Sequence, residues 1–204
     1  MFAEEFSKYI GSSVYNEFNE LAGTVIGYVC DGIGEVRSVI VRSATEVYEI
    51  PIERIEFKQD NLKVLSSISY EFMNIERKIK SVHGRFSNLG KISNEEVDEG
   101  VLNEIKKKTE ESYKQLSDYI EKFKSTVESK LATIINTIKS IDAALVEIKL
   151  QYLNGHISKE RFDETIKTLK ETKERLKNEF NYYNNYIKLV DNISKEAVVE
   201  VLVQ

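Results

Sequence analysis

Few residues of this chain have the types and spacings that catalysis requires. Gly32 and Gly34 could belong to a phosphate-binding loop, but such a loop leads into a helix and these glycines fall between predicted strands. The single cysteine, Cys30, ends an apolar stretch, which is typical of a small buried residue. His83 and His156 lie on opposite predicted hairpins, far apart, which argues against a shared metal site. We therefore predict a non-enzymatic protein with no catalytic residues, cofactor or metal.

The distribution of charge bears on nucleic-acid binding. The 204 residues include 29 basic and 34 acidic side chains, with a net charge of −5 at pH 7. Residues 1–65 account for the deficit, and the rest of the chain is balanced. Lys106, Lys107 and Lys108 form a local basic run with Lys114, although a solvated helix face accounts for it as well. Phosphate-driven binding needs clustered cations, so nucleic acid is an alternative partner that we do not favour.

The single proline is Pro51, so the later chain can form long uninterrupted helices. Two kinds of sequence, before and after residue 65, together predict an α+β fold. Residues 1–65 alternate aromatic and β-branched runs with turn signals, as strands do. We expect a small antiparallel β-barrel there, because continuous and alternating apolar stretches are mixed as in a strongly curved sheet. The predicted strands cover residues 13–15, 23–30, 35–42, 46–50, 55–58 and 62–65.

Beyond residue 65 the apolar residues recur at spacings of three and four, the pattern of a coiled coil. The pattern predicts a three-helix antiparallel rod over residues 66–193, with helices at about 66–88, 94–153 and 158–192. Folding back at the two turns pairs Ile134 with Leu176 and Ile79 with Ile105. Both turns share a glycine that ends one helix, an isoleucine, and a serine that caps the next. These hairpin tips comprise Gly90, Ile92 and Ser93, and Gly155, Ile157 and Ser158.

The remaining segment, residues 194–204, carries a candidate partner or assembly strand over residues 197–203. Six of the last eight residues are apolar and four are valine, a composition that favours a strand. The strand residues are Ala197, Val198, Val199, Val201, Leu202 and Val203. We expect this strand to add to a barrel edge of its own or a neighbouring chain. Tyr182 and Tyr186, beside the coiled-coil residue Tyr183, are candidate assembly contacts.

The order of residues in the β segment resembles the PRC-barrel family. The matching motifs are Ile10-Gly11-Ser12-Ser13-Val14, Ala22-Gly23-Thr24-Val25, Val39-Ile40-Val41 and Tyr48-Glu49-Ile50-Pro51-Ile52-Glu53-Arg54-Ile55. Asn19 stands in a turn where the family usually has glycine, and asparagine also tolerates the left-handed conformation. PRC barrels are adaptor modules, so the resemblance implies an interaction role.

With the long helices added, residues 7–190 resemble the archaeal cell-division family CdvA, which has a PRC-like barrel ahead of a coiled coil. The local match runs from Ala144-Leu145 to Ile157-Ser158, with Phe162 following. The resemblance implies a self-assembling, filament-forming cytoplasmic scaffold, which acts at the division site on the inner face of the membrane and contacts the membrane only indirectly. It also implies recruitment of an ESCRT-III homologue, whose winged-helix domain is a second docking site for the tail. The resemblance fits the main division factor or a divergent paralogue, and a chromosome-organising coiled-coil protein is the alternative.

Overall fold

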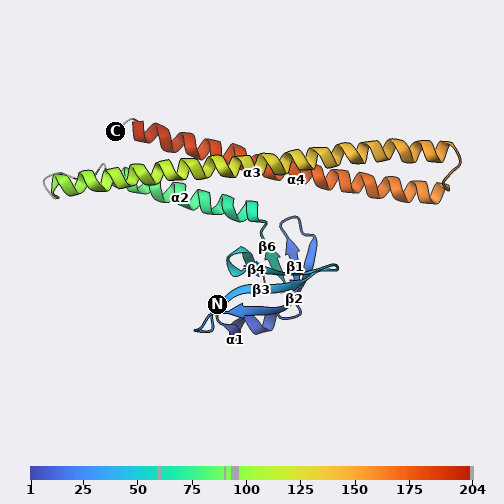
Figure 1. Cartoon of the computed structure of the whole chain (residues 1–204), viewed down its shortest axis with the longest axis horizontal. Coiled ribbons are helices and arrows are strands. Elements are labelled where there is room, and N and C mark those ends of the chain that lie inside the picture. The colour runs from blue at the N-terminus through green and yellow to red at the C-terminus, as the bar shows by residue number, and fades with distance from the viewer. Residues whose placement is uncertain (59–60, 90, 93–96, 203–204) are drawn as a thin grey trace. The chain divides into compact units, whose positions relative to one another are not determined.

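The structure, a computed structural model, describes residues 1–58, 61–89, 91–92 and 97–202 (Figure 1). It divides into two compact units, Met1–Met73 and Asn74–Gln204. The first unit contains a sheet and the second contains helices, which confirms the α+β class.

The first unit contains all six predicted strands in one sheet. They are β1 (Ser13–Asn16), β2 (Leu21–Cys30), β3 (Val36–Arg42), β4 (Val47–Pro51), β5 (Ile55–Phe57) and β6 (Leu62–Val64). Their order across the sheet is β4-β3-β2-β1-β6-β5. A short helix that the sequence analysis missed, α1 (Ala3–Phe6), precedes them.

The sheet is open and mixed, so the predicted closed antiparallel barrel is wrong. β6 runs parallel to β1, with Val14 beside Leu62, and in the described residues β4 and β5 are the two edges and do not pair with each other. Pro51 ends β4, and a 3-10 turn at Ile52–Arg54 separates β4 from β5. β5 and β6 have only three residues each, which is too short to close a barrel.

Two positions in this unit need residues that permit a close approach of strands or a tight turn. A Cβ atom on Gly23 would lie 2.5 Å from the carbonyl oxygen of Arg42 and 2.7 Å from Cγ1 of Val41, so only glycine fits between β2 and β3. Asn19 has a φ of 60°, as the sequence analysis expects for this turn. The buried core consists of Phe6, Val14, Val25, Val36, Val39, Val41, Ile50, Ile55, Leu62 and Val64.

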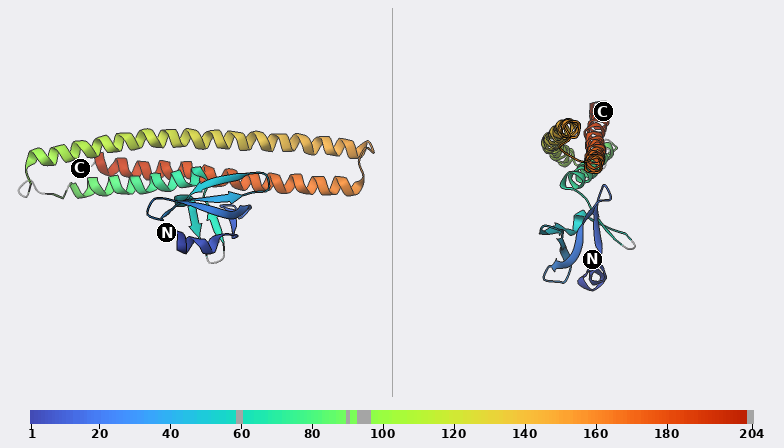
Figure 2. Two further views of the ribbon diagram at one scale, coloured as in Figure 1. Left: turned by 60° about the horizontal axis from the view of Figure 1, so that its bottom comes forward. Right: turned by 90° about the vertical axis from the view of Figure 1, so that its right-hand side faces the viewer.

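The three predicted helices are present as α2 (Ser67–Leu89), α3 (Glu99–Leu153) and α4 (Lys159–Leu202). The last part of α2, from residue 74, belongs to the second unit with α3 and α4. α3 and α4 run antiparallel and side by side in all the views (Figures 1 and 2). The buried residues of α3 and α4 repeat at the predicted spacings and include Leu116, Ile120, Phe123, Val127, Leu131, Ile134, Ile141, Leu176, Tyr183 and Val190.

The register between α3 and α4 lies within about one helical turn of the predicted pairing. The rings of Tyr152 and Phe162 stack with centroids 4.4 Å apart near the connecting turn. Further along the helices, Lys130 Nζ lies 2.8 Å from Glu179 Oε1. Lys173 occupies a position where the spacing calls for an apolar residue, and its ammonium group pairs with Asp142 on α3.

The register between α2 and α3 differs from the prediction. Ile79 lines the same cavity as Ile120, whereas folding back at Gly90 would place it beside Ile105, about four turns earlier. α3 begins at Glu99, and the Asp98 carboxylate caps it by accepting the Val101 N–H at 3.1 Å. The chain between the helices therefore covers residues 90–98, longer than a tight turn. Gly90 and Ser93, which predicted the tight turn, lie outside the described residues.

The predicted C-terminal strand is wrong, because α4 continues as a helix to Leu202. The three-and-four spacing of Tyr183, Ile187 and Val190 continues through Ser194, Ala197 and Val201, so the sequence also supports a longer helix. Valine costs less than about 1 kcal/mol per residue in a helix. Extending an existing helix needs no new nucleation, whereas a strand needs a pairing partner. Val203, the last residue of the predicted strand, lies outside the described part.

Candidate interaction sites

In the part of the chain that the structure describes, no group of three or more His, Cys, Asp or Glu side chains is arranged to hold a metal ion. None of the described helices is long and apolar enough to span a bilayer. Cys30 is half-buried at the end of β2.

The turn that holds Gly32 and Gly34 already encloses an anionic group from its own chain. One carboxylate oxygen of Asp31 accepts the N–H groups of Ile33 and Glu35, each at 3.0 Å. The other oxygen pairs with Arg37. Desolvation raises the pKa of Asp31, but the hydrogen bonds from Arg37 and the backbone outweigh it and place the pKa below its ordinary value. These N–H groups are thus engaged by a side chain and are not directed at a phosphate.

The turn between α3 and α4 has a complete set of capping bonds. Gly155 has a φ of 74°, and its N–H bonds the carbonyl of Tyr152 at 3.0 Å. The N–H of His156 bonds the carbonyl of Gln151 at 2.9 Å, which completes a Schellman motif. Ser158 then accepts the Arg161 N–H on its Oγ at 3.3 Å. The glycine and serine of this predicted tip therefore lie at the end of one helix and the start of the next.

Beside this turn α3 exposes a line of apolar side chains that the sequence analysis missed. Val146, Leu150 and Leu153 are between 50% and 77% exposed, and their spacing of four and three places them on one face. We call them the tip stripe. The isoleucines of the two predicted hairpin tips differ in exposure. Ile157, in the turn beside the tip stripe, is half-buried, whereas Ile92, which precedes α3, is exposed. The sequence feature that could have revealed the tip stripe is its spacing of four and three, which forms a second apolar line on α3 beside the one that packs against α4.

The two candidate assembly tyrosines of α4 contact each other. The hydroxyl of Tyr186 donates to that of Tyr182 at 2.6 Å, and the ring centroids are 5.0 Å apart. Tyr183 is buried, as its coiled-coil position predicts. Contact of Tyr182 and Tyr186 with another molecule stays a prediction.

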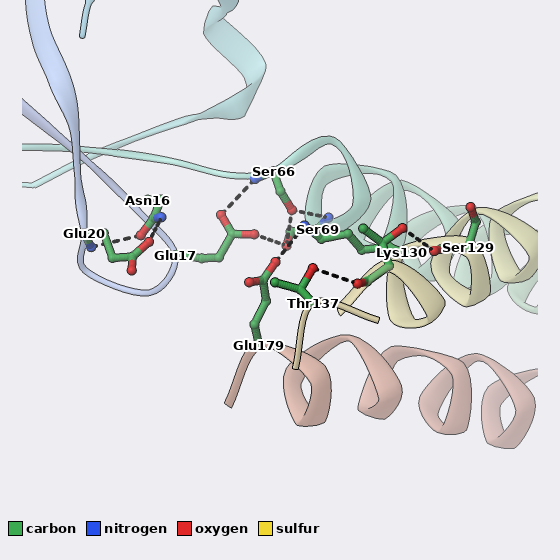
Figure 3. A network of polar contacts seen from close by, with 10 residues as sticks. Asn16, Glu17, Glu20, Ser66, Ser69, Ser129, Lys130, Thr137 and Glu179 are labelled. Atoms are coloured by element: carbon green, nitrogen blue, oxygen red, sulfur yellow. Dashed lines mark hydrogen bonds and ion pairs between the residues drawn. The ribbon is translucent and has the colours of Figure 1, made fainter. Parts of the chain in front are cut away.

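A polar network in the first unit joins the β1–β2 turn to the start of α2 (Figure 3). The Glu17 carboxylate accepts the Ser66 N–H and the Ser69 hydroxyl, each at 3.0 Å. Ser66 Oγ in turn accepts the Ser69 N–H at 3.1 Å and caps the helix. Glu17 is 49 residues from Ser66, and no local pattern indicates this contact.

A cavity of about 80 Å³ lies between the last part of α2 and α3. We call it the α2–α3 groove. Its apolar walls are Ile79, Val82, Phe86, Tyr113, Leu116 and Ile120. The rings of Phe86 and Tyr113 meet edge to face, with centroids 6.4 Å apart.

Lys124 stands at the rim of the α2–α3 groove and connects it to α4. Its Nζ lies 2.7 Å from the Asp191 carboxylate. This hydrogen bond is the main cause that raises the pKa of Lys124 above its ordinary value. The predicted basic run is elsewhere on α3, where Lys106, Lys107 and Lys108 are exposed and Lys108 pairs with Glu104 at 2.6 Å.

Comparison with known proteins gives two matches. Residues 69–203 match the CdvA-like coiled-coil domain family. The chain is also similar to Cell division protein A of Sulfolobus acidocaldarius, with 17% identity over 196 residues. That alignment covers 96% of this chain and 82% of the Sulfolobus protein.

Proposed function

This chain belongs to the CdvA family of coiled-coil cell-division proteins, and we propose that it is a non-enzymatic scaffold that assembles into filaments and recruits ESCRT-III-like membrane-remodelling proteins. The observation that carries the proposal is the family match over residues 69–203, which includes all of α3 and α4. The scaffold has a β unit for one set of contacts and long helices for another.

Exposed features of both units support self-assembly. The tip stripe offers apolar area on α3, and in the described residues β4 and β5 have unpaired outer edges. Contacts between different surfaces of identical chains give open polymers when their rotation does not close. Tyr182 and Tyr186 stay candidate contacts within such a polymer. The site of assembly that we propose is the inner face of the membrane at the division plane.

Recruitment of an ESCRT-III homologue is proposed from the family relationship. The route first expected, a tail strand added to the winged-helix domain, does not apply to a segment that is helical through Leu202. We therefore propose that the ESCRT-III homologue binds to the exposed helical surfaces of the second unit.

The test of recruitment is a binding measurement between the immobilised full chain and the purified winged-helix domain of the ESCRT-III homologue. We expect saturable binding with a Kd in the micromolar range, about −8 kcal/mol. An unrelated winged-helix domain of similar charge serves as the matched control and should not bind. Equal retention of both domains, or of neither, would contradict the proposal.

Nucleic-acid organisation is the function that we do not propose. The basic run Lys106–Lys108 on α3 is flanked by Glu104, Glu110 and Glu111, and Lys108 pairs with Glu104. Binding to phosphates requires clustered cations and weakens steeply with salt.

A further inference from the structure

We propose that two copies of this chain pair through their tip stripes, with the two α3 helices antiparallel about a two-fold axis and Asp142 of each copy beside Lys149 of the other. The proposal rests on the self-assembly proposed above and names one contact of it. It concerns the second unit alone.

The first argument is the apolar face itself. The three side chains of the tip stripe, Val146, Leu150 and Leu153, are 59%, 50% and 77% exposed, so α4 does not cover them. Ala143, also exposed, continues their spacing of three and four along α3. Burying this face against a second copy of itself removes apolar surface of both copies from water.

The second argument is the charge beside this face. A helix turns by about 100° per residue, so Asp142 and Lys149 lie on the same side of Val146, displaced around the helix by about 40° and 60°. Asp142 pairs with Lys173 on α4, yet its side chain is still 51% exposed, and Lys149 is exposed. When two such helices pair antiparallel about a two-fold axis, the same side of each helix meets. The tip stripe is therefore complementary in charge to a second copy of itself.

The charged residues also set the register of the pair. Each Asp142 lies level with the Lys149 of the other copy, so two equivalent ion pairs flank the apolar contact. The two-fold axis then passes beside Val146, which lies level with residue 145 of the other copy.

This register gives Leu150 a place to pack. It lies level with residue 141 of the other copy, between Lys139 and Ala143 on the same face. The small side chain of Ala143 leaves room for the leucine, and the aliphatic stem of Lys139 can cover its other side. A contact of three large side chains per copy is smaller than the roughly 800 Å² per partner of a stable interface. We therefore expect the pair to form with rising concentration rather than permanently.

A cysteine placed near the axis tests this register in the full chain. With Cys30→Ser as background, Val146→Cys brings the two introduced thiols opposite each other. Leu153→Cys is the matched control, because it lies on the same stripe and is more exposed, yet its two copies lie about 22 Å apart along the helices. Since a disulfide requires Cα atoms within about 7 Å, we expect at least about tenfold more crosslinked dimer for Val146→Cys.

Charge reversal tests the ion pairs by the same crosslinking of the Val146→Cys chain at low salt. Lys149→Glu alone, or Asp142→Lys alone, places like charges opposite each other twice and should lower the dimer yield at least about fivefold. In an equal mixture of the two variants each introduced charge faces an opposite one, so the yield should return to within about twofold of its original value. Mixing would not repair the lost pair between Asp142 and Lys173 within a chain, so recovery identifies a contact between copies.

Equal yields from Val146→Cys and Leu153→Cys, or a mixture that stays at the level of its two components, would overturn the proposal. Electron microscopy of the same samples separates this outcome from the failure of self-assembly. Filaments without preferential crosslinking of Val146→Cys would overturn the tip-stripe contact and leave self-assembly standing. The absence of both crosslinked dimers and filaments would contradict both.

Discussion

Ile134→Asp is expected to separate α3 from α4 and to abolish most of the helical structure of the second unit. Ile134 is 2% exposed in the middle of the α3–α4 interface. Removing a buried isoleucine side chain costs about 2–5 kcal/mol, and burying a carboxylate without a partner adds to that cost. The free energy of unfolding, measured by urea titration of the circular dichroism at 222 nm, should fall by about 4 kcal/mol or more.

The adjacent residue supplies the matched control for this prediction. Ile135 is of the same type in the same helix, but it is 40% exposed. Ile135→Asp should therefore change the free energy of unfolding by less than about 1 kcal/mol. Similar losses in the two variants would show that Ile134 does not face α4 in solution.

Phe6→Ala is expected to destabilise the β unit by about 3–5 kcal/mol. Phe6 has no exposed surface, and its ring contacts Tyr9, Tyr28 and Phe57 at centroid distances of 5.7, 5.2 and 6.1 Å. Its loss would leave a cavity that the short α1 cannot fill by collapse. Hydrogen exchange of the β2 and β3 amides, followed by mass spectrometry, should accelerate accordingly.

Phe2→Ala is the control for the β unit. Phe2 precedes the same helix but is 52% exposed, so its removal should leave the exchange of the sheet amides almost unchanged. If the β2 and β3 amides of the Phe6→Ala variant exchanged as slowly as those of the unmodified protein, the packing described for α1 would be contradicted.

The elements of this fold were predictable from the sequence because their signals are local. Six short β-branched runs specified the strands, and the spacing of residues such as Val127 and Leu131 specified the coiled coil. That the sheet is open and mixed was not predictable, because its strand order depends on β6 pairing parallel to β1, a non-local contact. The α2–α3 register was missed because it depends on the length of the connection before Asp98 rather than on apolar spacing.

The interaction sites were predictable in part. The capping glycine and serine of the α3–α4 turn were found, because each has a residue type that its conformation favours. The tip stripe was missed because Val146 and Leu150 resemble core residues until the uncovered face of α3 is known. The tail was predicted as a strand from its valines, although the helical spacing through Ala197 and Val201 pointed to the helix that is present.

The central claim, that the chain is a self-assembling scaffold, is tested most directly by negative-stain electron microscopy of the purified full chain over a concentration series. Exposed apolar surface on α3 and unpaired strand edges predict filaments that appear above a threshold concentration and lengthen beyond it. Separate single molecules at the highest concentration would contradict the claim.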